Sequence, residues 1–531
     1  PDDNGAKIYN AAGAQEIPPL DEEMARIVES IATARSLPWD EAVRSGMIRW
    51  IPPEAYEAYL GANLAVTRRP DRRSAKVVFT PLHGTGWSSV GAVLERAGFE
   101  IENFPLQSEP DGSFPNVPFR SPNPEVKESL ASATEWARER GADLVLAADP
   151  DADRLGLVVP DAKGTWRFLN GNQIGTLLTA YLLEERARAG QRGGFGVTTV
   201  VTTSLFRRMC EFYDVHAVSD LGIGFKYIAD VLNQIEAKGA YRDIRGTLDD
   251  FVLGIEESHG YLVTPAIRDK DAAGAALLLA ELASVLRDEG KTAPEHLDDL
   301  YRRFGYVSNH LRSTVMQGAR GFINIRAIQE SLRREPPRSI AGLGLVRFVD
   351  RWDEATFGPF LADTDRAARD LLTFELESDT RIVLRPSGTE SKNKVYVEVV
   401  GQPLGANASS DDLAREKRMI DDRAREVAAA FCLEMLHRIG VDLEPWALEV
   451  SDLVALEWKQ DFGASFVPEL LQRLDAGEAD ATLETWIDGR LRPYGADGRL
   501  LVRGAIAAWI EAKEPARGLR DRLVSLFRIT A

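Results

Sequence analysis

Cysteine, histidine and long apolar runs are all scarce in this sequence, and each scarcity excludes a class of protein. The 531 residues include two cysteines, Cys210 and Cys432, which are too few for a disulfide framework and too far apart for a CxxC metal site. The six histidines show no HExxH pattern. No apolar run approaches the roughly 18 residues of a membrane-spanning helix, and the first residues show no signal-peptide pattern. We therefore expect a cytoplasmic protein that does not enter a membrane.

Basic residues are outnumbered by acidic ones. The sequence has 64 lysines and arginines against 82 aspartates and glutamates, for a formal net charge of −18. Nucleic-acid binding depends on clustered lysine and arginine, so this balance argues against a nucleic-acid partner. A small anionic substrate is still compatible, because a local site can oppose the sign of the whole chain. At roughly 100–200 residues per domain, the length indicates three to five domains.

Strand and helix patterns alternate over residues 74–305 and predict the fold class. This alternation is typical of α/β units with doubly wound sheets, and two such units of similar size follow one another. After residue 306 strand patterns flank a Gly/Ser turn, a long helix pattern covers residues 411–439, and the sequence beyond residue 440 is helical. The main strand patterns of the α/β part cover residues 75–80, 143–148, 155–159, 197–202 and 251–254. We expect four tryptophans of the last part to pack inward: Trp446, Trp458, Trp486 and Trp509.

The strongest chemical signal is an acidic loop that follows a buried strand pattern. Its aspartates, Asp149, Asp151 and Asp153, alternate along the chain, and in an extended loop such residues point to one side. Oxygen ligands at the carboxyl end of a strand suit Mg²⁺. An EF-hand is excluded, because its sixth and twelfth positions would be Arg154 and Pro160. A solvated acidic turn, and an enzyme that uses Asp149 as a phosphoryl acceptor, remain alternatives.

A second loop, RPSGTE, lies between two strand patterns and is suited to an anion. Arg385 offers a bidentate fork for a phosphate, and Ser387 and Thr389 offer hydroxyl donors. Gly388 allows backbone N–H groups to close around the anion. A hydrogen-bonded hairpin turn is the alternative interpretation of this segment.

A third loop, GIEESHG, again follows a strand pattern. Glu256 and Ser258 are spaced to hold neighbouring sugar hydroxyls, and Lys270 follows in a charged RDKD segment. A plain polar turn is the alternative. The GTG sequence after the strand at residues 75–80 is not a dinucleotide loop, because Ser89 replaces the third glycine of GxGxxG.

The three loops, which follow one another along the chain as the acidic loop, GIEESHG and RPSGTE, resemble the α-D-phosphohexomutase superfamily of phosphoglucomutases and phosphomannomutases, and within it the bacterial phosphoglucomutase and phosphopentomutase branch. The resemblance covers about residues 1–440. It is carried by the following segments: PDDNGAKIYN, PLHGTG, PDGSFPNVPFRSPNPE, DPDADR, GNQIG, GIGFK, GIEESHG, RDKD and RPSGTESKNK.

The resemblance implies mixed α/β domains around a cleft, then a smaller α+β domain. The helical extension has no counterpart that we recognise. On this basis we expect five parts: residues 1–73 as the end of domain 1, residues 74–165 as a metal-binding domain 2, residues 166–305 as a sugar-binding domain 3, residues 306–440 as a phosphate-binding domain 4, and residues 441–531 as the extension.

The resemblance also implies a reaction and a role for each loop. Glucose 1-phosphate and glucose 6-phosphate would interconvert through a phosphoserine and a bisphosphate intermediate, and other hexose or pentose phosphates are possible substrates. The implied roles are Mg²⁺ binding for Asp149, Asp151 and Asp153, contact with the transferring phosphoryl group for Arg154, acid/base help for Lys7 and Lys270, hydroxyl binding for Glu256 and Ser258, and binding of the other phosphate for Arg385, Ser387, Gly388 and Thr389.

The family's serine motif, normally T-A-S-H-N-P, is missing from this sequence. By the resemblance it belongs immediately before PDDNG, at the first residue. We therefore expect a truncated form of an active enzyme, which is inactive by itself. The alternatives are a non-catalytic phosphosugar-binding protein and a magnesium-dependent phosphatase.

Overall fold

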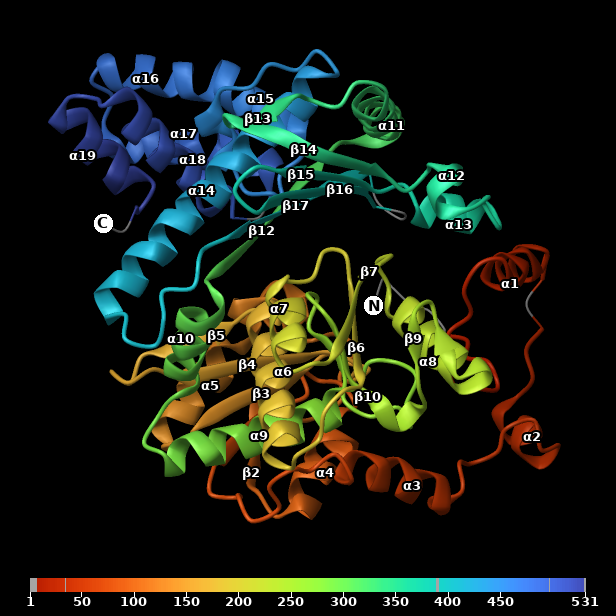
Figure 1. Ribbon diagram of the computed structural model, residues 1–531. Helices are drawn as coiled ribbons and strands as arrows, with labels where there is room; N and C mark the ends of the chain where they lie inside the picture. Colours follow the sequence, from red (N-terminus) through yellow and green to blue (C-terminus); the bar gives the residue numbers. More distant parts are fainter. Residues whose placement is uncertain (1–6, 34, 388–390, 496, 530–531) are drawn as a thin grey trace. The chain divides into compact units, whose positions relative to one another are not determined.

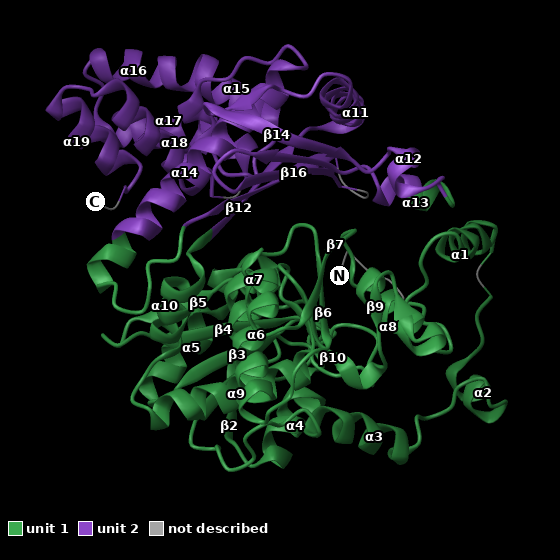
Figure 2. Cartoon of the chain, viewed as in Figure 1, with its two compact units in different colours: residues 1–307, 361–365, 402–414 green, residues 308–360, 366–401, 415–531 purple. Residues whose placement is uncertain are grey.

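The computed structural model describes residues 7–33, 35–387, 391–495 and 497–529, which fall into two compact units. Unit 1 comprises residues 1–307, 361–365 and 402–414, and unit 2 comprises residues 308–360, 366–401 and 415–531 (Figure 2). Among the described helices, none combines the length and the apolar character that crossing a membrane requires. Each unit is built around its own sheets.

The first sheet of unit 1 has five strands in the order β2-β1-β3-β4-β5 (Figure 1). β1 (Lys76–Thr80) pairs in parallel with both β2 (Glu100–Asn103) and β3 (Leu144–Ala148). β4 (Leu155–Pro160) and β5 (Trp166–Leu169) continue the sheet in antiparallel pairing. Every residue of β3 is buried, as the continuous apolar run of a strand covered on both faces requires.

The second sheet of unit 1 has four strands in the order β11-β10-β6-β7. β6 (Phe195–Thr199) pairs in parallel with β10 (Phe251–Glu256) and β7 (His216–Leu221), while β11 (Gly260–Leu262) is antiparallel to β10. The strand predicted over residues 197–202 was placed too late in the chain. It ends at Thr199 because the following β-branched residues form a turn, in which the Thr202 N–H donates to the Thr199 carbonyl at 3.2 Å.

Two long apolar helices of unit 1 begin at well-defined caps. α6 (Gly171–Arg188) starts with a reciprocal capping box between Asn170 and Gln173, and α9 (Ala272–Asp288) starts where the Asp271 carboxylate accepts the Ala273 N–H at 2.9 Å. Further elements before residue 307 are α1 (Leu20–Glu29), α2 (Trp39–Arg44), α3 (Pro53–Leu64), α4 (Val90–Ala97), α5 (Ala131–Glu139), α7 (Leu205–Phe212), α8 (Phe225–Lys238), α10 (Ala293–Phe304), and the hairpin of β8 (Ala240–Tyr241) and β9 (Ile244–Arg245).

Unit 2 contains a six-stranded sheet in the order β12-β17-β16-β15-β14-β13. Neighbouring strands from β13 to β17 pair in antiparallel fashion, so this part is a meander and differs from the parallel sheets of unit 1. The strands are β12 (Val307–Val315), β13 (Ser339–Ile340), β14 (Leu343–Asp350), β15 (Leu372–Leu376), β16 (Thr380–Pro386) and β17 (Lys392–Val400). The helices α11 (Gly318–Arg334) and α12 (Glu354–Phe357) belong to unit 2, whereas α13 (Asp363–Ala368) and α14 (Ser410–His437) begin in residues of unit 1 and continue into unit 2.

The end of the chain is helical, as predicted. Its helices enclose one apolar cluster, in which Trp446 and Trp509 are buried and Trp458 and Trp486 pack against the buried residues. Phe466 stacks on Trp486 with ring centroids 5.3 Å apart. The helices are α15 (Leu456–Asp461), α16 (Val467–Asp475), α17 (Asp480–Leu491), α18 (Gly498–Lys513) and α19 (Arg517–Leu526).

This helical extension is tied to the sheet of unit 2 at β12. Arg312 of β12 forms an ion pair with Glu449 at 2.9 Å, and the Ser313 N–H donates to the Asp452 carboxylate at 2.7 Å. β12 is an edge strand, and the carboxylate satisfies a backbone donor that such an edge leaves without a strand partner. The extension therefore packs as part of unit 2.

Candidate active site

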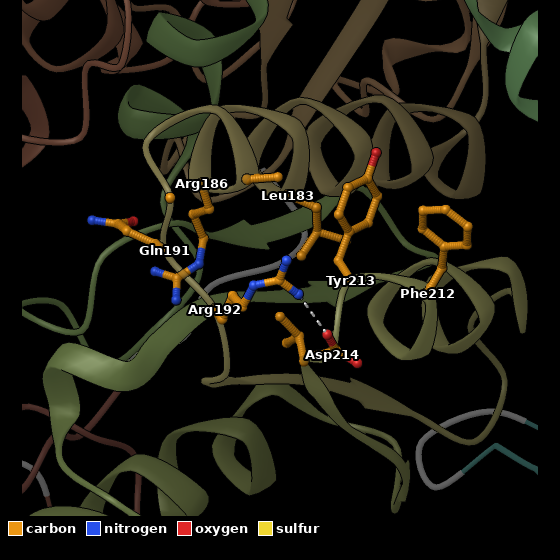
Figure 3. Close-up of a pocket in the computed structure, with 10 residues that line it drawn as sticks. Leu183, Arg186, Gln191, Arg192, Phe212, Tyr213 and Asp214 are labelled. Carbon is orange, nitrogen blue, oxygen red and sulfur yellow. Dashed lines mark hydrogen bonds and ion pairs between the residues drawn. The ribbon is translucent and has the colours of Figure 1, made fainter.

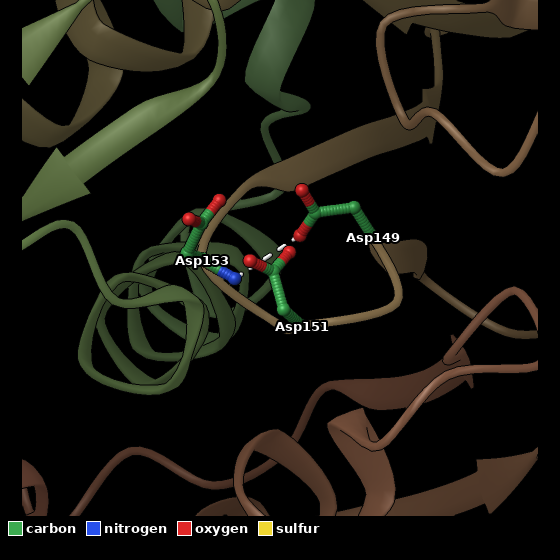
Figure 4. A group of neighbouring side chains, drawn as sticks. All are labelled: Asp149, Asp151 and Asp153. Atoms are coloured by element: carbon green, nitrogen blue, oxygen red, sulfur yellow. Dashed lines mark hydrogen bonds between the residues drawn. The ribbon is translucent and has the colours of Figure 1, made fainter. Parts of the chain in front are cut away.

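The acidic loop connects β3 to β4 in unit 1. The Asp149 carboxylate is buried and accepts the N–H groups of Asp153 at 3.0 Å and Arg154 at 2.9 Å, which folds the loop back on itself. Ala152 has a positive φ of 56°. The loop is thus a tight turn, and the extended conformation assumed from the sequence is wrong. The turn still brings one carboxylate oxygen from each of Asp149, Asp151 and Asp153 within 4.8 Å of the others (Figure 4).

Two lysines neutralise this acidic cluster. The Lys7 ammonium contacts Asp151 at 2.5 Å and also contacts Asp153, while the Lys270 ammonium contacts Asp153 at 2.9 Å. Burial, reinforced by the charge of Asp153, raises the pKa of Asp149 to about 7. Burial acts to raise the pKa of Asp153 as well, but Lys270 and Lys7 outweigh it and hold that pKa below its ordinary value.

The three carboxylates fit a hard divalent cation. They supply oxygen ligands only, which is the donor set that Mg²⁺ and similar ions prefer. The Lys7 ammonium lies between Asp151 and Asp153, where it provides the positive charge that two neighbouring carboxylates require. Partial burial acts to lower the pKa of Lys7, but its contacts with the two aspartates outweigh burial and raise that pKa above its usual range. The cluster therefore has the donor set of a site for a divalent cation.

The PLHGTG segment packs against the backbone of the acidic loop and bonds to it. The Thr85 N–H and hydroxyl both donate to the Pro150 carbonyl, at 2.9 and 3.0 Å. A Cβ at Gly84 would collide with the backbone of Pro150, so only glycine permits this approach. The His83 ring bonds to the Glu109 carbonyl at 2.8 Å and holds the segment in place. These residues position the acidic loop, and the structure gives them no other contact with the aspartates.

Arg154 is the last residue of the acidic loop, and its side chain contacts Glu125, which was not predicted from the sequence as a site residue. Its guanidinium donates to the Glu125 carboxylate at 2.8 Å. Both side chains are about one-third exposed, so the pair lies at the surface of the site, where a third group can reach the arginine. Glu125 belongs to the PNPE segment quoted for the resemblance, and that segment was the available signal for it.

The GIEESHG turn is attached directly to the acidic loop. The Leu155 N–H donates to the His259 carbonyl at 3.0 Å, and the His259 ring lies 3.0 Å from the Leu155 carbonyl. Burial lowers the pKa of His259, so its ring is neutral and serves as a structural hydrogen-bonding group. A side chain at Gly171, the first residue of α6, would collide with the Glu257 carbonyl. The two predicted loops are therefore neighbours in unit 1.

Within this turn, Glu256 is buried at the end of β10 and Ser258 is half-buried. The Glu256 carboxylate accepts the Gly224 N–H, from the GIGFK segment, at 3.1 Å. Burial, together with the nearby charge of Glu257, raises the pKa of Glu256 to about 7. A carboxyl group in this state can change its protonation near neutral pH, which bears on its proposed role in binding hydroxyl groups.

The RDKD segment joins the beginning of the described chain to the site. The Asp269 carboxylate accepts the Tyr9 hydroxyl at 2.9 Å and the Gln15 amide at 2.8 Å. Asp269 also lies 3.9 Å from the Lys270 ammonium. Tyr9 and Asp269 belong to the PDDNGAKIYN and RDKD segments quoted for the resemblance, but neither they nor Gln15 were predicted as site residues, because no local pattern connects residues so far apart in the chain.

The predicted anion loop is in unit 2. Arg385 lies at the end of β16 opposite Lys394 of β17, and the Ser387 N–H donates to the Lys392 carbonyl at 2.8 Å. Gly388 and Thr389 lie outside the described residues. The hairpin thus places one predicted phosphate ligand, Arg385, on a regular strand next to a second cationic residue. The other predicted site residues, Lys7 among them, belong to unit 1.

Comparison with known proteins identifies the family. The models for phosphoglucomutase/phosphomannomutase, alpha/beta/alpha domains II and III, match residues 54–164 and 170–304. A probable phosphomannomutase of Haemophilus influenzae is 33% identical over 408 residues, which are 76% of this chain and 76% of that protein. The chain belongs to the phosphoglucomutase/phosphomannomutase family. A phosphoglucomutase of Staphylococcus saprophyticus is 32% identical over 402 residues, covering 74% of this chain and 70% of the relative.

The match confirms the predicted family, fold class and enzyme class, since relatives of these names are isomerases that transfer a phosphoryl group. The expected truncation and the expected bacterial branch stay predictions for this phosphoglucomutase/phosphomannomutase family member. Among solved structures, a putative phosphomannomutase from Thermus thermophilus covers 69% of this chain and 66% of its own, with 21% identity and a TM-score of 0.44. The predicted domain boundaries stay predictions, as do the individual roles of the site residues.

Proposed function

We propose that this chain carries the metal, sugar and phosphate loops of a phosphosugar mutase that interconverts glucose 1-phosphate and glucose 6-phosphate through a phosphoserine and a bisphosphate. The observation that carries the proposal is the joint placement in unit 1 of the acidic loop, the GIEESHG turn and two lysines. An isolated acidic turn would have no reason to be bonded to a carboxylate-serine turn on the neighbouring sheet. The family relationship supports the same conclusion.

In this proposal the acidic cluster holds Mg²⁺. The residues that would bind the ion are Asp149, Asp151 and Asp153. When bound, the ion supplies positive charge to a transferring phosphoryl group, which is the main requirement for catalysing phosphoryl transfer. Arg154, held by Glu125, adds a fork of N–H donors for phosphoryl oxygens.

Lys7 and Lys270 are proposed to assist proton transfer at the sugar hydroxyl or to stabilise its negative charge. Both ammonium groups contact Asp153, and Lys7 is held in its protonated form by the aspartates. A protonated lysine can donate a proton to a leaving oxygen, whereas a general base must first lose one. The arrangement therefore favours Lys7 as an acid or an electrostatic contact rather than as a base.

The T-A-S-H-N-P motif, whose serine would accept and donate the phosphoryl group, does not occur in the printed sequence. We propose that the chain without a serine segment binds phosphosugars and does not turn them over. The rival phosphatase, which would use Asp149 as the nucleophile, is disfavoured by the structure. The two backbone N–H groups that bond to the Asp149 carboxylate occupy its lone pairs, and the raised pKa leaves more of this group in the protonated form, which is not a nucleophile.

The test is product analysis with glucose 1-phosphate and Mg²⁺, on the printed chain and on the same chain extended by the sequence that precedes it in its gene. The proposal expects glucose 6-phosphate from a serine-containing extended protein and no product from the printed chain. Free phosphate from either protein would favour a phosphatase. Glucose 6-phosphate from the printed chain would show that the serine is dispensable and would overturn the proposed mechanism.

Sugar-phosphate binding is expected to strengthen as pH rises through about 7, the pKa of Glu256. Below that pH the carboxyl group is protonated and loses capacity to accept hydrogen bonds from sugar hydroxyls, and above it the carboxylate accepts them. Between about pH 6 and about pH 8 the ionised fraction changes roughly tenfold, which sets the upper limit of the effect on affinity. Calorimetric titration with glucose 6-phosphate measures it.

The control for this experiment is Glu256→Gln. The phosphate ester of the ligand also titrates in this range, and that contribution is the same for both proteins. The difference between the two pH profiles therefore reports Glu256 alone. Identical profiles for the wild-type protein and the variant would contradict a role for the Glu256 carboxylate in binding.

A further inference from the structure

A pocket of about 250 Å³ opens in unit 1 away from all the loops discussed so far (Figure 3). It is bounded by the end of α6, the segment that leads into β6, and the turn between α7 and β7. The lining residues that matter here are Leu183, Arg186, Arg192, Tyr213, Asp214 and Val215.

The pocket lies at the opposite edge of the second sheet from the candidate active site. β6, β7 and β10 are parallel, and Glu256 is the last residue of β10, at the carboxyl edge. Arg192 precedes the first residue of β6, and Val215 precedes the first residue of β7, so both lie at the amino edge. A ligand in this pocket is therefore not in the substrate position.

Arg186 gives the pocket a positive charge that the nearby Asp250 offsets only in part. Its guanidinium is partly buried and donates to the Gly193 carbonyl at 3.1 Å. Within the described part of the chain it forms no ion pair with a carboxylate. Burial and the nearby Arg68 lower the pKa of Arg186 and outweigh the opposite effect of Asp250, so the surroundings disfavour its charged form. A partly buried cation in this situation is stabilised by an anionic ligand.

A second arginine, Arg192, also lines the pocket and forms an ion pair with Asp214 at 3.1 Å (Figure 3). Both side chains of this pair are largely exposed, with 84% and 69% of their surface accessible. Such an exposed pair is weak, so Arg192 can turn to another anion at little cost. Two arginines against one aspartate leave a net positive charge in a chain whose formal charge is −18.

The remaining wall is apolar and aromatic. Leu183 and Val215 are buried, and the Tyr213 hydroxyl accepts a hydrogen bond from Arg303 at 3.2 Å. The Arg303 guanidinium lies 4.2 Å from the centroid of the Phe212 ring, which helps to fix this side of the pocket. An apolar wall facing a pair of arginines is suited to a small organic molecule that carries an anionic group.

We propose that this pocket is a second ligand site, separate from the mutase site, which binds a small organic dianion such as a phosphate ester or a dicarboxylate. The volume is below the range of roughly 300–1,000 Å³ typical of drug-sized ligands, and it suits a compact metabolite. The planar forks of Arg186 and Arg192 match the oxygens of a phosphate or carboxylate group.

The test is hydrogen–deuterium exchange on the whole chain with inorganic phosphate, glucose 6-phosphate or malonate, each compared with sodium chloride at equal ionic strength. We expect slower exchange in residues 190–194 and 212–215 with at least one of these ligands. Protection by glucose 6-phosphate together with phosphate indicates a phosphate ester, and protection by malonate alone indicates a dicarboxylate. Exchange at residues 256–260 reports binding at the proposed substrate loops separately.

Three variants decide whether ligand binding in the pocket causes the slower exchange. Arg186→Gln and Arg192→Gln are each expected to raise the ligand concentration needed for half-maximal protection about tenfold, which is the effect of one lost charge-assisted contact. Arg192 is exposed, so its replacement tests the site without a risk to folding. Arg188→Gln is the matched control, because Arg188 lies on the same helix, pairs with Glu185 at 2.7 Å and does not line the pocket. Absence of protection with all three ligands, or equal weakening by Arg188→Gln, would overturn the proposal.

Discussion

Replacing Asp153 with asparagine is expected to abolish specific binding of a divalent cation by unit 1. Asp153 contributes one of the three clustered oxygens and lies between two lysine ammonium groups. Loss of its charge removes a ligand and leaves both lysines to repel an incoming cation. Loss of an outer-shell partner alone typically costs about 10–100-fold in metal affinity, so loss of a ligand should cost at least about 100-fold. Mn²⁺ binding, followed by electron paramagnetic resonance, measures the effect.

Two further variants sharpen this experiment. Asp220→Asn removes an aspartate that is exposed and pairs with Arg242 at 2.7 Å, so it should leave Mn²⁺ binding unchanged. Lys7→Gln should strengthen Mn²⁺ binding, because the Lys7 ammonium occupies the space between Asp151 and Asp153. If Asp153→Asn bound Mn²⁺ as tightly as the unaltered chain, the acidic cluster would not be the metal site.

Replacing Gly84 with alanine is expected to displace the acidic loop and to destabilise unit 1. The added methyl group would meet the backbone of Pro150, and backbone cannot move aside as a flexible side chain can. Overpacking of this kind costs about 1–3 kcal/mol in the free energy of unfolding. Because Pro150 lies between Asp149 and Asp151, the displacement should also weaken Mn²⁺ binding. Urea denaturation and the Mn²⁺ assay measure the two effects.

Gly112 provides the matched control for this substitution. It lies in the same part of unit 1, and a Cβ at this position meets no atom within 4 Å. Gly112→Ala should therefore leave both stability and Mn²⁺ binding close to those of the unaltered chain. If Gly84→Ala behaved in the same way as Gly112→Ala, the PLHGTG segment would not support the acidic loop.

The sequence analysis succeeded where the signal is local. Three loops at the ends of strands were found because each contains a run of polar residues directly after apolar residues. The helical nature of the last part was likewise evident from its pattern, and the apolar cluster around Trp446 and Trp509 bears it out. The conformation of the acidic loop was misjudged, since the N–H groups that bond to Asp149 fold it into a turn rather than an extended segment.

Contacts between distant segments were beyond the reach of the same analysis. Nothing local to Glu125 shows that it will meet Arg154, and Tyr9 and Asp269 are separated by 260 positions in the chain. The support that Gly84 gives to Pro150 belongs to the same class. Such contacts depend on how strands that are far apart in sequence are ordered in a sheet.

The amino-acid sequence by itself determined the family, the α/β fold class and the loops that are candidates for the site, because these follow from local patterns and from resemblance along the chain. Only the tertiary structure decided which residues of those loops face one another. Folding joined the acidic loop to the GIEESHG turn, because the Leu155 N–H donates to the His259 carbonyl and the His259 ring bonds to the Leu155 carbonyl. It also placed Lys7 and Lys270 on Asp153. The physical reason is that the charge of a carboxylate, and hence its chemistry, depends on burial and on neighbours that folding alone brings near.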